Sequence, residues 1–523
     1  MERSRLYFLI TYLASICLAF IVIYVRYHEP LINPHFYTED ATWFSLLMYD
    51  DFFDVLLKAK EQYFVLGNLL LLKISLLTND FFCNKNILFL PKTLYWISVI
   101  FYAVALNMHF FVFKNFISNG KLLFISFCLI ILSLHGSDYE VFSRASNVGF
   151  IFYYIALMVI TFQATSISNK TNLFAGNIII LISIYTNPAV FFLLPLHAYN
   201  VFIHRKENIF SLYAAILTYF LSIGQVIHMM QNTQLSLSGA YGRLIEVIFA
   251  RSILFPLIEP IYHGFNDFFS VAFTLILICL LIIIILNFSG SKKLKIIYFF
   301  LSYGLIIITL LSAYTRPFDT ISGYLSSWPD RYFYIQNLIV ILIVSTLALI
   351  NIKAKFKIFM IIIVSIYIIN SSISLYKYSG NKIMTYYPPL DLLIKERLFL
   401  SSGSDFITIP TYFVGWQDMK IPKTLTHLDG GKETITALKI FPINDDNWEY
   451  GVSNDFTGFL TYNLSVYRGL ISDGNVEFVI DGKARKLQSI KEVGRFLYIV
   501  LEGEKLRGNL ELREIEFMQR TLE

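Results

Sequence analysis

Charged residues are scarce in this chain of 523 residues, and several signatures of soluble enzymes are missing. Asp, Glu, Lys and Arg make up 15% of the residues, whereas soluble proteins carry about 25%. The four cysteines lie at irregular spacing in or beside apolar stretches, without a CxxC motif, which indicates apolar packing rather than a metal site. There is no Walker A loop, dinucleotide-binding glycine turn, HExxH or GxSxG, so ATP coupling and soluble-nucleotide chemistry have no support.

Long apolar segments are what the chain has instead. Hydrophobic residues make up 56%, and the mean hydropathy is +0.60. Runs such as 273–286 and 338–350 predict helices that cross a bilayer, because only helices and closed barrels satisfy the backbone in lipid. We expect a polytopic α-helical membrane protein with about ten to twelve spans. The expected apolar segments are residues 7–25, 62–78, 93–113, 121–134, 148–163, 173–200, 209–229, 270–287, 295–312, 333–351 and 355–373.

Basic residues predict which side of the membrane each loop faces. Arg3 and Arg5 precede the first apolar segment and no small-x-small cleavage site follows it, so we expect a retained signal anchor that starts inside. Basic clusters also predict inside loops at 204–206, 292–295 and 353–357. External segments are then 230–268, 313–332 and everything after 375. Lys114 and Lys121 favour another inside loop, which needs a re-entrant piece between 62 and 92.

The composition changes after residue 375. Pro388-Pro389 and the run 401–404 are linker chemistry, and short β-type runs then alternate with turn signals such as Asp481-Gly482. We therefore expect a transmembrane domain over 1–375 with an external first loop at 26–61, a linker at 376–403, and a β-rich, sandwich-like domain over 404–523 on the outer face. The small net charge of +5 does not suggest a nucleic-acid partner.

Two adjacent carboxylates, Glu39 and Asp40, follow the first span among aromatic residues. A carboxylate in a partly dehydrated cleft can act as a general base, and such a pair can also bind a divalent cation. The following stretch, 49–58, has the spacing of an amphipathic helix in the membrane interface. The alternative is that the pair is ordinary loop polarity.

Further polar islands lie between apolar segments. The island 137–147 carries Asp138, Glu140, Arg144 and Asn147; acids at the end of a span are costly unless paired or functional. The alternative there is an i,i+4 ion pair of Glu140 with Arg144.

Arginines in the expected external segments run against the usual charge bias. A planar guanidinium suits a phosphate, and the alternative is pairing with nearby acids or lipid headgroups. In the tail, a tryptophan next to a glycine could stack on a sugar ring, or serve as an interfacial anchor or packing residue. These candidates are Arg243, Arg316, Arg331, Tyr332 and Trp416.

Over residues 1–420, several short phrases resemble GT-C glycosyltransferases, multispanning enzymes that use polyprenyl-phosphate-linked sugars. The phrases are Tyr37 to Phe44, Glu140-Val141-Phe142 with Asn147, Asn187-Pro188 with Leu194-Pro195-Leu196, Asp330-Arg331-Tyr332, and Ile409-Pro410 with Gly415-Trp416. The overall plan is similar to that of serotype-converting O-antigen glucosyltransferases. The resemblance implies Asp40 or Glu39 as the base, Glu140 near the pocket and Arg331 facing the donor phosphate. Here the two acids are adjacent, whereas in the family they are often separated by one residue.

These observations predict a transferase that moves a hexose such as glucose from a polyprenyl-phosphate donor to a surface glycan such as the O-antigen of lipopolysaccharide. The expected place is the external face of a bacterial inner membrane. In this hypothesis Asp138, Asn147 and Trp416 line the acceptor pocket, Arg316 and Arg243 assist Arg331, and a divalent cation (Mg²⁺ or Mn²⁺) would bind at Glu39 and Asp40. The alternatives are a flippase or transporter for a lipid-linked glycan, and an O-antigen polymerase or ligase.

Overall fold

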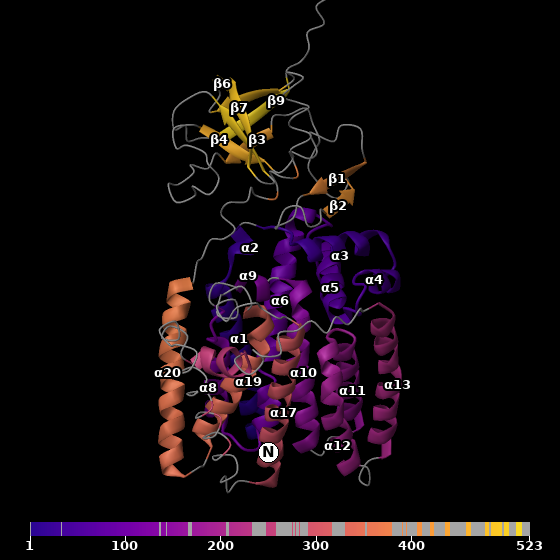
Figure 1. The fold of residues 1–523 in the computed structure, drawn as a ribbon, viewed down its shortest axis with the longest axis vertical. Helices are drawn as coiled ribbons and strands as arrows, with labels where there is room; N and C mark the ends of the chain where they lie inside the picture. Colours follow the sequence, from indigo (N-terminus) through magenta and orange to yellow (C-terminus); the bar gives the residue numbers. More distant parts are fainter. Residues whose placement is uncertain are drawn as a thin grey trace, which may run out of the picture. The chain divides into compact units, whose positions relative to one another are not determined.

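The structure is a computed structural model, and it describes most of the membrane region and separate strands of the C-terminal region (Figure 1). The described residues are 2–32, 34–134, 138–142, 144–165, 170–204, 209–232, 247–257, 275, 278, 282, 291–315, 330–350, 353–378, 390, 394, 405–409, 419–422, 435–439, 457–461, 476–480, 483–493, 496–501 and 509–514.

Two compact units divide the chain, and each is built from segments that are separate in sequence. The first unit comprises Met1–His28, Asp51–Leu72 and Leu94–Asn381, and the second comprises Glu29–Asp50, Lys73–Thr93 and Lys382–Glu523. The division predicted from composition, at 375 and 404, stays a prediction.

The described part of the chain contains seven helices long and apolar enough to cross a membrane. They are Arg5–Arg26, Ile87–Phe113, Ala145–Thr165, Leu212–Gln231, Lys292–Ser312, Arg331–Leu349 and Ala354–Lys377, and shorter apolar helices are Asn119–Ile130, Leu173–Ile184 and Pro188–Ile203. The chain is therefore a multi-pass helical protein, as predicted. The expected span at 270–287 lies almost wholly outside the described residues.

The helices of the membrane region are these, in chain order. They are α1 (Glu2–Arg26), α5 (Leu66–Phe82), α6 (Leu90–Leu106), α7 (His109–Phe113), α8 (Asn119–Ile130), α9 (Asp138–Val141), α10 (Ala145–Thr165), α11 (Lys170–Ile184), η2 (Pro188–Leu193), α12 (Leu194–His204), α13 (Ile209–Asn232), η4 (Val247–Leu254), α17 (Lys292–Thr315), α19 (Asp330–Leu349) and α20 (Ala354–Tyr378).

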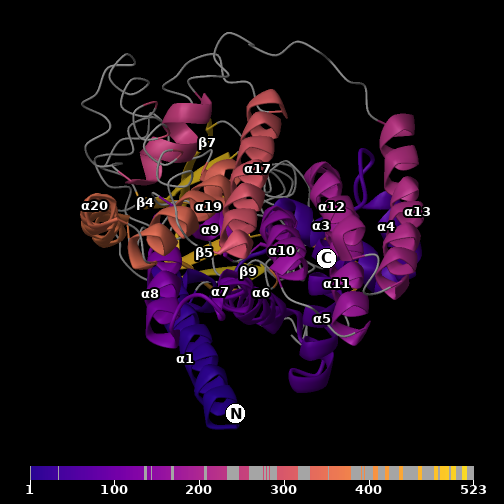
Figure 2. The same cartoon turned by 90° about the horizontal axis from the view of Figure 1, so that it is seen from below.

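Helices α10 and α19 form the centre of the first unit. They bury 78% and 89% of their spanning residues, whereas α1, α13 and α20 bury 22%, 28% and 33%. Figure 2 shows α13 and α20 at the periphery and α10 between them. Apolar side chains such as Phe220 and Ile362 are exposed on the outer helices, which is the arrangement expected when the surrounding solvent is lipid. Tyr153 ties the centre together by donating to the carbonyl of Gly304 on α17 at 2.8 Å.

The predicted break in the segment 173–200 is confirmed. Helix α11 ends at Ile184, and the Asn187 side chain accepts a hydrogen bond from the Ala189 amide at 3.0 Å, capping the 3-10 turn η2 before α12 begins. Proline cannot donate to the helix ladder, so Pro188 at the first position of the turn is where a new element can start.

In the second unit, the first segment is helical rather than a loop. The expected external loop at 26–61 contains α2 (Glu29–Ile32), α3 (Thr38–Tyr49) and, within the first unit, α4 (Phe52–Lys58). The predicted amphipathic helix at 49–58 is α4 alone, because α3 ends at Tyr49 and Asp50 is extended, with φ −105° and ψ 156°.

Antiparallel strands occupy the described parts of the C-terminal region, each run predicted from the sequence lying within or overlapping one. Strands β1 (Phe406–Ile409) and β2 (Met419–Pro422) pair with each other. A four-stranded sheet has the order β3 (Ile435–Lys439), β9 (Asn509–Glu514), β5 (Val476–Ile480), β6 (Lys483–Arg485), and a three-stranded sheet has the order β4 (Thr457–Thr461), β8 (Phe496–Leu501), β7 (Leu487–Val493). Ile480 pairs with Lys483 across Asp481-Gly482, a sequence favoured in two-residue hairpin turns.

Candidate functional site

The acidic pair lies in the first turn of α3. Tyr37 precedes the helix in an extended conformation without a side-chain cap, and its carbonyl accepts from the Ala41 amide at 2.7 Å. Acids in a first turn are favoured by the helix dipole, which explains why helix begins here. The two carboxylates differ in environment: Glu39 is exposed, and Asp40 is 1% exposed.

Aromatic side chains around the pair in sequence are buried. Phe36, Tyr37, Trp43 and Phe44 are all at most 4% exposed. The rings of Phe36 and Phe44 meet edge to face with centroids 6.2 Å apart, an arrangement that aromatic quadrupoles favour. The segment that carries Asp40 therefore has an apolar interior.

His35 is a residue of this segment that sequence reasoning missed. It is 7% exposed, and burial lowers the pKa of its imidazole to about 4, because the charged form loses its hydration. The imidazole is thus neutral at pH 7. Its position two residues after a span-flanking proline, Pro30 aside, carries no recognisable motif; only its proximity to the acidic pair could have drawn attention to it.

The strand pair β1–β2 packs on α3. The Ser45 hydroxyl donates to the carbonyl of Lys420 at 2.7 Å, although the two residues are 375 positions apart. The ring of Tyr49 lies 5.9 Å from that of Phe406, between centroids. On the strands, the buried side chains alternate with exposed ones, as one-sided packing requires. The start of the C-terminal region is therefore part of the support of the acidic helix.

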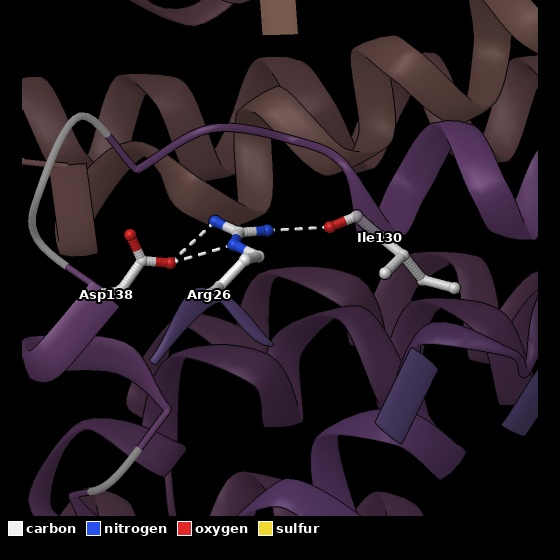
Figure 3. A network of polar contacts seen from close by, with 3 residues as sticks. All are labelled: Arg26, Ile130 and Asp138. Carbon is white, nitrogen blue, oxygen red and sulfur yellow. Dashed lines mark hydrogen bonds and ion pairs between the residues drawn. The ribbon is translucent and has the colours of Figure 1, made fainter. Parts of the chain in front are cut away.

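Asp138 is held in a buried ion pair (Figure 3). The Arg26 guanidinium donates from Nε to Asp138 Oδ1 at 2.9 Å, its Nη2 lies 2.7 Å from the same oxygen, and its Nη1 donates to the carbonyl of Ile130 at 2.6 Å. The two side chains are 3% and 11% exposed. The guanidinium also lies 5.1 Å from the centroid of the Phe142 ring. Arg26 thus joins the end of α1 to the end of α8 and the start of α9.

This arrangement gives Asp138 a structural role that the sequence did not predict. A buried charge needs a partner, and removing one member of such a pair is costly. Arg26 went unrecognised because its partner lies 112 residues away. Its one local signal is an arginine in the last turn of a span, where a cation complements the helix dipole.

The other candidates of the 137–147 island lie on two helices. Glu140 belongs to α9, and its side chain is outside the described residues. The expected i,i+4 pair with Arg144 lacks its helical geometry, since α9 ends at Val141 and α10 begins at Ala145. Asn147 is 8% exposed in the first turn of α10.

Neighbouring amides secure this end of α10. Asn68 donates from Nδ2 to the carbonyl of Ser146 at 2.9 Å, and Asn187 donates to the carbonyl of Gly149 at 3.0 Å. These contacts fix the turn that carries Asn147.

Arg331 and Tyr332 form a rigid pair at the start of α19. The Arg331 Nη2 donates to the Tyr332 hydroxyl at 2.8 Å, and the guanidinium carbon lies 4.8 Å from the Tyr332 ring centroid. The Tyr332 carbonyl accepts from the Ser312 hydroxyl at 3.3 Å. A fixed guanidinium at a helix N-terminus is suited to an anion, because both carry positive potential.

Arg251 is a further buried cation, within the expected external segment 230–268. It is 0% exposed in the π-helical turn η4. Its guanidinium carbon lies 4.0 Å from the ring centroid of Phe255 and 5.1 Å from that of Phe333. Such turns interrupt helices and are frequent at functional positions.

The remaining predicted residues fall outside the description or in different units. Arg243, Arg316 and Trp416 lie outside the described residues. Glu39 and Asp40 belong to the second unit, and Asp138, Glu140, Asn147, Arg331 and Tyr332 belong to the first. Within the described residues, no group of three His, Cys, Asp or Glu side chains could hold a metal ion.

No family model, curated protein or solved structure compared with the chain matches it. The functional argument therefore depends on the residues themselves.

Proposed function

We propose that the chain is an integral-membrane glycosyltransferase that moves a sugar, a hexose such as glucose, from a polyprenyl-phosphate donor to a surface glycan such as O-antigen. The observation that carries this proposal is the burial of Asp40, 1% exposed, in an aromatic segment next to the first span. A carboxylate shielded from water can serve as a general base, and Glu39 in its exposed position is less suited to that role.

The proposed reaction is an inverting displacement. The acceptor hydroxyl attacks the anomeric carbon, the bond from that carbon to the donor phosphate oxygen breaks, and the bonding electrons leave with the phosphate. Asp40 takes the hydroxyl proton. Arg331 stabilises the charge that develops on the phosphate, with Arg316 and Arg243 assisting. Glu140, Asn147 and Trp416 contribute to the acceptor pocket.

The finer architecture belongs to the same proposal. Residues 404–523 form an extracytoplasmic β-rich domain on the periplasmic side of a bacterial inner membrane. The antiparallel sheets described above support the β-rich part of this proposal. A donor with a long lipid tail explains why such an enzyme would need membrane helices beside a water-exposed acceptor site.

The test is Asp40→Asn, with Glu39→Gln as the matched control. In membranes that contain equal amounts of protein, we expect Asp40→Asn to lower the transfer rate by about 10²- to 10⁴-fold, the contribution of a general base. Glu39→Gln should retain most of the rate. The measurement is hexose transfer to a defined acceptor, followed by mass spectrometry. Full activity of Asp40→Asn would remove this mechanism.

A transporter for lipid-linked glycans is the second candidate, and the burial of Arg251 favours it. Ionisable groups within a membrane domain often mark a substrate path. Surface glycan from cells with and without the protein separates the classes. A missing hexose branch supports the transferase, loss of whole chains indicates a polymerase or ligase, and donor lipid retained on the inner leaflet indicates a flippase.

A further inference from the structure

One end of the first unit gathers basic side chains. Lys121 donates to the carbonyl of Leu349 at 3.0 Å, which brings the start of α8 to the end of α19. The Tyr298 hydroxyl donates to Thr346 Oγ1 at 3.1 Å, which brings the first turns of α17 to the same end. The basic side chains in these segments, exposed or half-exposed, are Arg5, Lys114, Lys121, Lys292, Lys293, Lys295, Lys353, Lys355 and Lys357.

Acidic groups do not neutralise this end. In the described segments 2–12, 109–125, 291–300 and 345–360, Glu2 is the only acid. Within the described residues none of the nine basic side chains makes an ion pair. The local charge is therefore strongly positive and open to an external anion.

Lys114 has the most defined surroundings of the group. Its ammonium lies 5.8 Å from the ring centroid of Phe8, 6.0 Å from that of Phe111 and 5.5 Å from that of Phe162. The three rings come from α1, α7 and α10. Ring faces attract a cation at this distance and restrict its position. An ammonium has three N–H donors, so an exposed lysine held in this way can still donate to a phosphate.

The rings themselves are fixed by further aromatic contacts. The Tyr12 ring lies 5.1 Å from that of Phe111 and 5.6 Å from that of Phe110, between centroids. The Phe8 ring lies 6.0 Å from that of Phe110. The start of α1 is thus anchored to α7, and the place of Lys114 is built before any ligand arrives.

Exposed apolar side chains beside this cluster identify the anion as part of a lipid. Leu6, Leu9, Ile10 and Leu13 on α1 are 50–59% exposed. They follow the same helix as Phe8, so a phosphate at Lys114 would have an apolar surface next to it on which acyl chains can lie. A free phosphate has no use for that surface.

We propose that this basic end binds the headgroup phosphate of anionic phospholipids, with Lys114 and its three aromatic rings as the principal site. The proposal concerns the first unit alone and does not depend on glycosyl transfer. Clusters of four to eight basic residues next to membrane helices commonly recognise anionic lipid in this way. The site would also anchor the end of the first span at the more negative membrane surface.

The test is native mass spectrometry of the full-length protein in detergent, titrated with phosphatidylglycerol or phosphatidylcholine of the same acyl chains. We expect the wild type to retain phosphatidylglycerol in preference. Lys114→Gln should weaken that binding by about fivefold, the effect of one lysine near an anionic surface. Lys114→Arg keeps the charge and should restore it.

Lys60 provides the matched control. Its ammonium lies 4.5 Å from the ring centroid of Tyr63, but Glu61 is adjacent, so Lys60→Gln should leave lipid binding unchanged. Equal retention of the two lipids by the wild type would overturn the proposal, as would unchanged binding by Lys114→Gln. Displacement of the lipid by inorganic phosphate at equal concentration would point to a free-anion site and would also overturn it.

Discussion

Asp40 and Asp138 make the most informative comparison in this molecule. Each is a buried aspartate in the first turn of a helix near the end of an apolar segment. Asp138 is matched by Arg26, whose guanidinium reaches it through two nitrogens. Asp40 has an exposed acid, Glu39, as its neighbour and aromatic residues on both sides in sequence. An acid near the end of a span is therefore not in itself a catalytic sign, because its partner decides its role.

Breaking the Arg26–Asp138 pair should give the largest effect on stability. Arg26→Ala or Asp138→Asn leaves an uncompensated or weakened buried contact, and loss of one member of such a pair costs about 3–5 kcal/mol. We expect a lower unfolding temperature in detergent and less protein in the membrane. Thermal stability followed by size-exclusion chromatography measures this.

The double variant Arg26→Met, Asp138→Leu sharpens the same comparison. Apolar residues of similar size remove both charges, so its stability should exceed that of either single variant. If the double variant is as unstable as the sum of the two single changes, the pair is not a coupled unit.

The titration of His35 should give the next largest effect. Its pKa is lowered from 6.5 to about 4, so between these values the unfolded chain binds a proton that the folded chain does not. Its neutral form therefore stabilises the fold above pH 6.5, and about 3 kcal/mol is lost as the pH falls to 4. The unfolding temperature of the wild type should fall more steeply over this window than that of His35→Gln. Parallel pH profiles for the two proteins would contradict the burial of a neutral imidazole.

The contact of Ser45 with Lys420 should give the smallest effect. Ser45→Ala removes one hydrogen bond to a carbonyl, worth about 1 kcal/mol. Hydrogen exchange of the α3 amides should become faster, while exchange in α10 should not change. Equal exchange of α3 in both proteins would mean that the strand pair does not stabilise the acidic helix.

Sequence patterns predicted local features of the fold well. Apolar length located the spans, Asn187-Pro188 located the break after α11, and Asp481-Gly482 located a hairpin. Helix α3 was mistaken for a loop because Tyr37 offers no capping side chain. The pair of Arg26 with Asp138 could not be predicted, since it depends on how separate helices pack and has no periodicity.

The candidate site divides along the same line. Composition identified the acidic pair and the arginine before Tyr332, because both are unusual residue types beside spans. It could not tell Asp40 from Glu39, since the difference is burial of one and exposure of the other. His35 was missed for the same reason: its altered protonation comes from packing.

The contact between α3 and β2 also has a consequence for how the protein is made. Ser45 leaves the ribosome 375 residues before Lys420. At about 5–20 residues per second, roughly 20 to 75 s pass before the strand that covers the acidic helix exists. Through that interval the membrane helices are inserted one after another while α3 waits without its cover. Synthesis of the C-terminal region is thus the step that completes a unit begun just after the first span.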